Sequence, residues 1–117
     1  MNNRKTGIEG ESQAVEFLQN KGYKILERNY SCKIGEIDIV AKDKETLVFV
    51  EVKARKNTLF GMPVEAITPA KVRNIIGVAR YFLLAHKLHN VDCRFDVICI
   101  LKNKIEHIEN AFEVCGR

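Results

Sequence analysis

The chain has 117 residues, of which 46% are hydrophobic and 29% are charged, and 19 Lys and Arg side chains against 15 Asp and Glu give a net charge of +4. This length and composition predict one globular domain over residues 1–117 rather than a disordered chain, and they exclude a separate recognition domain. The mild positive charge permits a nucleic-acid partner but does not argue for one, because dedicated nucleic-acid binders carry denser basic patches.

The first predicted element is a helix over residues 6–21. Thr6 and Glu9 form a possible capping box at its start, and Gly22 follows it as a stop signal. The apolar side chains of this helix share one face, and Glu11 falls on the same face. Two interpretations of Glu11 remain open: an acid that faces inward and serves a site, or a side chain at the edge of the stripe that reaches water.

Three strands are predicted next, over residues 23–29, 36–41 and 47–53. Short turns separate them, so we expect an antiparallel meander with the first strand at the border of the sheet. Side chains of a strand alternate between its two faces. If the second and third strands pair across their turn, Asp38 and Glu51 therefore lie side by side with their carboxylates on a common face.

Residues 55–67 interrupt the pattern, and the next helix begins after them. Gly61 and Pro63 punctuate this stretch, whose apolar residues predict a functional loop or a contact between two copies of the chain. Thr68 and Pro69 are typical of an N-cap and a first helical turn. The apolar stripe of this second helix consists of Val72, Ile75, Ile76, Ala79, Phe82, Leu83 and His86.

Two further strands are predicted over residues 92–101 and 104–109. In the first of them Arg94 and Asp96 share a face, where the two side chains can pair with each other. The complete order is one helix, three strands, one helix and two strands. It predicts an α/β fold with a mixed central sheet flanked by a helix on each side, and a crossover through the second helix if the third and fourth strands are parallel.

Three charged side chains interrupt two apolar strand patterns: Asp38 in the second strand, and Glu51 and Lys53 in the third. An unpaired ion taken out of water costs several kcal/mol, so these charges indicate a site. Mg²⁺ prefers carboxylate and carbonyl oxygens, which makes Asp38, Glu51 and the backbone carbonyl of Val52 candidate ligands for Mg²⁺ or Mn²⁺. Lys53 can position an attacking water or a phosphate, and Glu11 can orient a metal-bound water or hold a second ion.

These residues carry a resemblance to known nucleases. The segment G-E-I-D-I-V-A followed by V-F-V-E-V-K-A-R, with G-E-S-Q-A upstream and R-F-D-V downstream, resembles the YraN family of endonuclease-like proteins in the PD-(D/E)xK superfamily. It is also similar to archaeal Holliday junction resolvases. The resemblance implies a restriction-endonuclease-like αβββαβ(β) core and the catalytic set Glu11, Asp38, Glu51 and Lys53. Ile37 stands where the motif is named for proline.

Basic residues outside this motif are candidate contacts to a phosphate backbone. Two of them follow Lys53 directly, one lies in the first turn of the second helix where free N–H groups favour phosphate, and two lie along that helix. They are Arg55, Lys56, Lys71, Arg73 and Arg80. Solvated helix charge is an alternative explanation for the last three.

Two functions from different classes fit the sequence. The first is a Mg²⁺- or Mn²⁺-dependent endonuclease that hydrolyses phosphodiester bonds in DNA, including branched or structured DNA, with a homodimer as the form that would cut both strands. The second is a non-catalytic nucleic-acid-binding or assembly module that retains the fold. RNA remains open as a substrate, because no residue is identified that reads a 2′-hydroxyl.

The sequence also bears on location. The polar first residues and the lack of an apolar run of roughly eighteen residues predict neither a signal peptide nor a membrane span. The cysteines have no C-x-x-C pair and no zinc-like spacing, which favours buried thiols in a reducing cytoplasm. They are Cys32, Cys93, Cys99 and Cys115.

Overall fold

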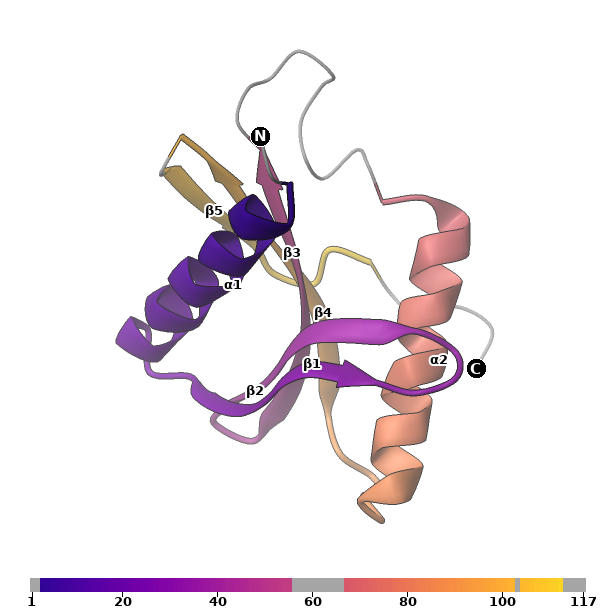
Figure 1. The fold of residues 1–117 in the computed structure, drawn as a ribbon. Coiled ribbons are helices and arrows are strands. Elements are labelled where there is room, and N and C mark those ends of the chain that lie inside the picture. Colours follow the sequence, from indigo (N-terminus) through magenta and orange to yellow (C-terminus); the bar gives the residue numbers. More distant parts are fainter. Residues whose placement is uncertain (1–2, 56–66, 103, 113–117) are drawn as a thin grey trace.

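A computed structural model describes residues 3–55, 67–102 and 104–112, with the backbone alone for residues 3–8 and 55. Its helices and strands follow the predicted order (Figure 1). They are α1 Asn3–Asn20, β1 Lys24–Ser31, β2 Glu36–Asp43, β3 Thr46–Arg55, α2 Pro69–Ala85, β4 Cys93–Leu101 and β5 Lys104–Ile108. The expectation of a functional or dimer-forming loop rests mostly on residues 56–66, which lie outside the described residues.

The five strands form one mixed sheet in the order β1-β2-β3-β4-β5. The first three strands are an antiparallel meander with β1 at the border, β3 and β4 are parallel, and β5 returns antiparallel to β4. Because β3 and β4 are parallel, α2 is the crossover between them, as predicted. The α/β class with a mixed sheet is thereby confirmed.

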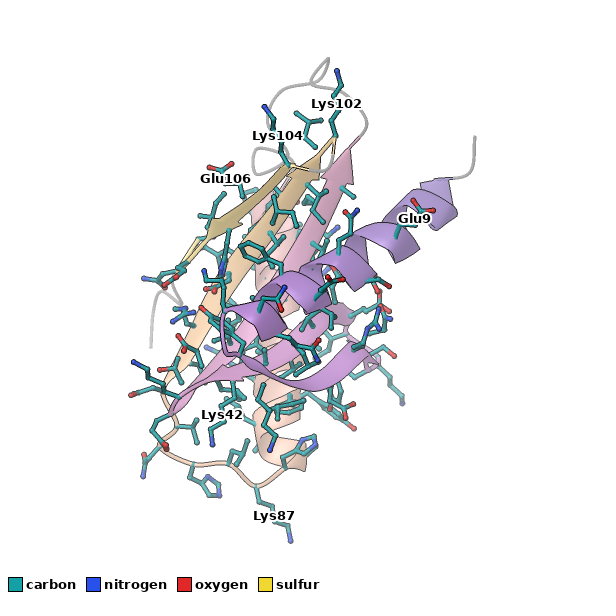
Figure 2. All side chains as sticks on the ribbon, turned by 90° about the vertical axis from the view of Figure 1, so that its left-hand side faces the viewer. Glu9, Lys42, Lys87, Lys102, Lys104 and Glu106 are labelled. Atoms are coloured by element: carbon teal, nitrogen blue, oxygen red, sulfur yellow. The ribbon has the colours of Figure 1, made fainter. Side chains whose placement is uncertain are left out.

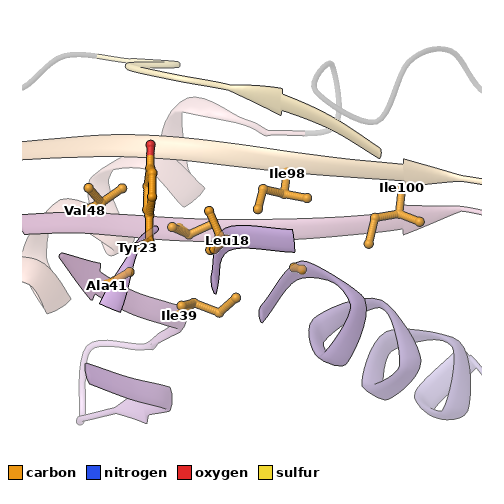
Figure 3. Packing of buried hydrophobic residues seen from close by; sticks show 9 residues of the cluster. Leu18, Tyr23, Ile39, Ala41, Val48, Ile98 and Ile100 are labelled. Atoms are coloured by element: carbon orange, nitrogen blue, oxygen red, sulfur yellow. The ribbon is translucent and has the colours of Figure 1, made fainter. Parts of the chain in front are cut away.

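The two helices cover opposite faces of the sheet, so the protein has two separate hydrophobic layers (Figure 1). On the α1 side, Leu18 and Tyr23 pack against strand residues such as Ile39, Val48 and Ile98 (Figure 3). The second layer lies between α2 and the other face. Its buried residues are Ile37, Val40, Leu47, Phe49, Ile75, Val78, Ala79, Phe82 and Phe95. The predicted three-layer arrangement is therefore correct.

Local sequence explains where α2 starts and which face it buries. Thr68 has extended backbone dihedrals, its hydroxyl accepts a hydrogen bond from the Lys71 N–H at 3.2 Å, and Pro69 occupies the first turn. The predicted apolar stripe omitted Val78, which is fully buried, and included His86, which is exposed. The buried face is thus rotated slightly from the predicted one, but the position of the N-terminus of α2 agrees with prediction.

The prediction of buried thiols is only partly right. Cys99 is buried and Cys32 is half-buried, but Cys93 is exposed because it begins β4 at the end of the sheet. Cys115 lies outside the described residues.

Charged side chains such as Lys87 and Lys102 project from opposite ends of the molecule (Figure 2). No helix within the described part of the chain is long and apolar enough to cross a membrane.

A buried polar cluster lies on the α1 side of the sheet, away from α2. The Asp96 carboxylate accepts hydrogen bonds from Arg94 Nε at 2.9 Å, Arg94 Nη2 at 3.1 Å and the Asn110 N–H at 2.9 Å, and it lies 2.7 Å from His107 Nε2. Arg94 also donates to the Tyr23 hydroxyl at 2.6 Å. The predicted pairing of Arg94 with Asp96 is confirmed, within a larger network that ties β4 to β5 and to Tyr23, which directly precedes β1.

Gly10 allows α1 to approach β3 closely. A Cβ placed on Gly10 would be 2.8 Å from the Cβ of Ala54, which is closer than two carbon atoms can come without a backbone shift. Glu11 follows Gly10 in the chain, so this contact also fixes the distance between Glu11 and the sheet. A glycine inside a helix usually costs stability relative to alanine, and close packing explains its presence here.

We expect Gly10→Ala to destabilise the protein by about 1–3 kcal/mol, because the added methyl group overpacks the contact with Ala54. Urea unfolding of the single and double variants measures the effect. The companion change Ala54→Gly removes the opposing Cβ, so the double variant should recover part of the loss through a coupling of the two sites. Additive losses would contradict the proposed contact.

Candidate functional site

Asp38 lies where β2 and β3 begin to separate. The ladder between these strands ends at the pair Ile39 and Val50, and Asp38 comes one step later, in the register position opposite Glu51. Here the Asp38 carboxylate accepts a hydrogen bond from the backbone N–H of Val52 at 2.8 Å. Beyond the end of the ladder, the Val52 N–H thus donates to the Asp38 side chain instead of to a backbone carbonyl of β2. This hydrogen bond holds the carboxylate against β3.

Burial and the nearby Glu51 both disfavour the ionised form of Asp38. Burial and the negative charge of Glu51 raise the pKa of Asp38 from 3.8 to about 8, while the hydrogen bond from Val52 acts in the opposite direction. A hydrogen bond between the two carboxyl groups and the charge of Glu11 contribute smaller increases. The structure therefore brings Asp38 and Glu51 together, as the strand pattern predicts.

Glu51 is the buried centre of a charge cluster on the α2 side of the sheet. Its Oε2 atom lies 3.4 Å from Lys53 Nζ and 3.4 Å from Lys71 Nζ. Lys53 comes from the same strand and its side chain is 12% exposed, whereas Lys71 comes from the first turn of α2 and its side chain is 46% exposed. One carboxylate thus has an enclosed lysine and a more exposed lysine as partners.

The two lysines differ in their affinity for a proton. Burial lowers the pKa of Lys53, and the neighbouring Lys71 lowers it further, although Glu51 acts in the opposite direction. A hydrogen bond with Lys53 raises the pKa of Lys71, and Glu51 and Asp38 add to that increase, although burial opposes it. The pKa values of the two lysines are therefore shifted in opposite directions, downward for Lys53 and upward for Lys71.

A cavity of about 440 Å³ opens beside this cluster. It lies between the divergent ends of β2 and β3 and the start of α2. Its lining residues are Gly35, Glu36, Asp38, Glu51, Thr68, Ala70, Lys71, Asn74 and Ile75. The acids and a lysine thus face a space that can admit a ligand, at the N-terminus of a helix where free N–H groups favour an anion.

The donor atoms at this site fit a divalent cation that binds oxygen. Asp38 and Glu51 supply two adjacent carboxylates, and burial together with the charge of Glu51 raises the pKa of Asp38. Mg²⁺ is commonly held by one or two carboxylates with water in its other positions. Among the described residues no three Asp, Glu, His or Cys side chains form a ready metal site, so a cation would rely on the acid pair, backbone oxygen and water.

Glu11 is half-buried on α1, and its charge still reaches Asp38. It does not line the cavity. This placement matches neither interpretation of Glu11 fully: its side chain is not fully exposed to water, and it does not line the cavity with the acid pair. A role in orienting water next to Asp38 stays a prediction.

The predicted nucleic-acid contacts divide into three groups. Lys71 is at the cavity. Arg73 and Arg80 are exposed on α2, and Arg80 lines a different hollow of about 720 Å³ between α2 and the start of β4. Arg55 ends β3 with its side chain undescribed, and Lys56 lies outside the described residues. Among the side chains of this set that the structure describes, Lys71 alone lies beside the acids.

Sequence reasoning missed two features of the site. Asn74 lines the cavity one turn after Lys71, a position that the spacing of three residues on a helix could have indicated. The ion pair between Lys71 and Glu51 was also not predicted, because it depends on where the chain returns after residue 66. No local sequence pattern predicts where the start of α2 lies relative to β3.

Comparison with known proteins identifies relatives of the whole chain. A family model described as "Uncharacterised protein family UPF0102" matches residues 10–100. A UPF0102 protein of Clostridioides difficile is 51% identical over 114 residues, which cover 96% of this chain and 100% of the relative. A UPF0102 protein of Lachnoclostridium phytofermentans is 49% identical over 117 residues, covering 99% of each chain. The matched region contains every residue at the cavity described above.

Proposed function

This chain belongs to the uncharacterised protein family UPF0102, and we propose that it is a metal-dependent endonuclease that hydrolyses phosphodiester bonds in DNA. The membership predicted from the resemblance to YraN proteins is confirmed by these matches. We also propose that the fold is restriction-endonuclease-like and that the family is part of the PD-(D/E)xK superfamily. The mixed sheet between two helices and the positions of the acids on β2 and β3 support this assignment.

One observation carries the proposal: Asp38 and Glu51 line a cavity that Lys71 and the start of α2 also border, and Lys53 lies 3.4 Å from Glu51. Asp38 and Glu51 would hold the cation, Mg²⁺ or Mn²⁺. The Val52 carbonyl is a further candidate ligand, because the N–H and C=O of a strand residue point to the same side and the Val52 N–H points to Asp38. A bound divalent cation supplies the positive charge that activates water and offsets charge on phosphate.

The lysines have separate roles in this proposal. Lys53 is held by Glu51 inside the site, where its ammonium group would position the attacking water or the scissile phosphate. Lys71 keeps its charge at the cavity mouth, where it attracts a phosphate together with the N-terminus of α2. We propose DNA, including branched or structured DNA, as the substrate.

The proposal is tested with labelled duplex, single-stranded, flap, four-way-junction and RNA substrates, each with Mg²⁺, Mn²⁺ or EDTA. We expect cleavage of at least one DNA substrate that requires the cation, and a loss of roughly a hundredfold or more in rate for Lys53→Ala, the usual contribution of a positioned acid or base. Arg28→Ala is a matched control, since Arg28 is an exposed cation on β1 that contacts Ser12 rather than the acids. Binding without cleavage of any substrate would instead identify a nucleic-acid-binding or assembly module.

A further inference from the structure

Lys71 and Lys53 share Glu51, but they are held in different ways. Lys53 lies on the same strand two residues beyond Glu51 and is enclosed. Lys71 reaches the same oxygen atom from α2, with nearly half of its side chain in solvent. A long side chain with an exposed stem can leave an ion pair at little energetic cost, because such pairs contribute modestly to stability.

The position of Lys71 matters because its partner is a candidate metal ligand. A carboxylate oxygen that is paired with ammonium groups is less available to a divalent cation, and Glu51 Oε2 already has two such groups at 3.4 Å, which repel an incoming cation. A cation that binds Glu51 through Oε2 would compete with both lysines, and Lys71 is the one whose exposed side chain can move into solvent.

We propose that Lys71 is an exchangeable counter-ion of Glu51: it pairs with the carboxylate while no divalent cation is bound and is displaced into the cavity when a cation binds. The displaced ammonium group remains beside the cavity that Thr68 and Asn74 line, where a substrate phosphate would contact it. Cation binding would thus convert Lys71 from a partner of the acid to a partner of the substrate. This inference rests on the proposed function, because it takes the acid pair as the cation site.

The test is the affinity of the intact, substrate-free protein for Mn²⁺, measured by isothermal titration calorimetry. Lys71→Ala removes the competing charge and should bind Mn²⁺ roughly twofold to fivefold more tightly, the factor that corresponds to an exposed ion pair. Lys71→Arg retains the charge and should bind like the parent protein. Arg73→Ala controls for long-range electrostatics, because it removes an equal charge from the same turn of α2. Arg73 is not an ion-pair partner of Glu51, whose partners in the described part of the chain are Lys53 and Lys71.

The proposal is overturned if Lys71→Ala binds Mn²⁺ no more tightly than Arg73→Ala, or if neither the parent nor Lys71→Ala binds Mn²⁺. Its outcome is separable from that of the endonuclease assay. Tighter binding in Lys71→Ala with no cleavage of any substrate would support the counter-ion exchange and contradict the endonuclease. Cation-dependent cleavage by the parent, with the same Mn²⁺ affinity in Lys71→Ala as in the parent, would support the endonuclease and contradict the counter-ion exchange.

Discussion

Asp38→Asn should abolish cation-dependent cleavage of DNA, with a loss of at least about a hundredfold in rate, while the protein remains folded. Asparagine keeps the shape and an oxygen acceptor for the Val52 N–H, which Asp38 binds at 2.8 Å. It removes the negative charge that the acid pair contributes to a cation. Steady-state cleavage of the best substrate in Mg²⁺, with circular dichroism of the same preparation, measures both parts of the expectation.

The same substitution should stabilise the protein at alkaline pH. The pKa of Asp38 is raised from 3.8 to about 8 in the folded state, so the folded protein binds a proton that the unfolded chain has lost over that interval. Stability therefore falls as the pH rises from about 4 to about 8, by linkage. Asparagine does not titrate, and the difference in unfolding free energy between variant and parent should grow in favour of the variant across this range.

Urea unfolding at several pH values from 5 to 9 checks this expectation by the linkage relation. Glu36→Gln is a suitable control, because Glu36 lies at the start of the same strand and lines the same cavity but is exposed. An inactive Asp38→Asn that is also less stable than the parent at every pH would show that Asp38 has a structural role. A variant that cleaves as fast as the parent would falsify the assignment of the site.

The second large effect concerns stability alone. Asp96→Ala should destabilise the protein by about 3–5 kcal/mol, because it leaves the enclosed Arg94 guanidinium without its main partner. The Asp96 side chain is completely buried, and it accepts two hydrogen bonds from Arg94 and one from the Asn110 N–H. Urea unfolding at pH 7 measures the loss. No change in Mn²⁺ affinity is expected, since this cluster and the acid pair lie on opposite faces of the sheet.

Asp43 provides the matched comparison. Its carboxylate lies 3.4 Å from Arg94 Nη1, but its side chain is 32% exposed, so Asp43→Ala should cost less than about 1 kcal/mol. Burial acts to raise the pKa of Asp96, but hydrogen bonds from His107, Arg94 and Asn110 together outweigh it and lower the pKa. The parent should therefore lose stability as the pH falls below about 4, and Asp96→Ala should lack that share of the loss. Equal losses for the two alanine variants would show that burial of the carboxylate is unimportant.

The meander and its acid pair were predictable because their determinants are local. Alternating side chains and a short turn fix the register of β2 and β3, and that register places Asp38 opposite Glu51. The start of α2 was equally predictable, since Thr68 and Pro69 carry its N-cap and first turn. Each of these features depends on residues within about one turn or one hairpin of one another.

Contacts between residues far apart in the chain were harder to predict from the sequence. The pairing of Arg94 with Asp96 follows from two residues on one strand face, but their other partners Tyr23, His107 and Asn110 come from both ends of the chain. The same holds for Lys71, which was predicted as a phosphate contact and proves to pair with Glu51. A sequence pattern reports the face on which a residue lies, whereas these contacts depend on how separate elements pack.

The turn between β2 and β3 has a further consequence. Only Lys44 and Glu45 separate the paired residues Asp43 and Thr46, and Lys44 adopts a left-handed backbone with φ of 56°. Strand side chains have a period of two, so one inserted residue that shifted the register by one step would move Asp38 out of its place opposite Glu51. The length of the turn thus sets the position of Asp38 relative to Glu51, several residues away. We therefore expect related sequences to vary in the residues of this turn but to keep its length, because the length sets the register that pairs Asp38 with Glu51.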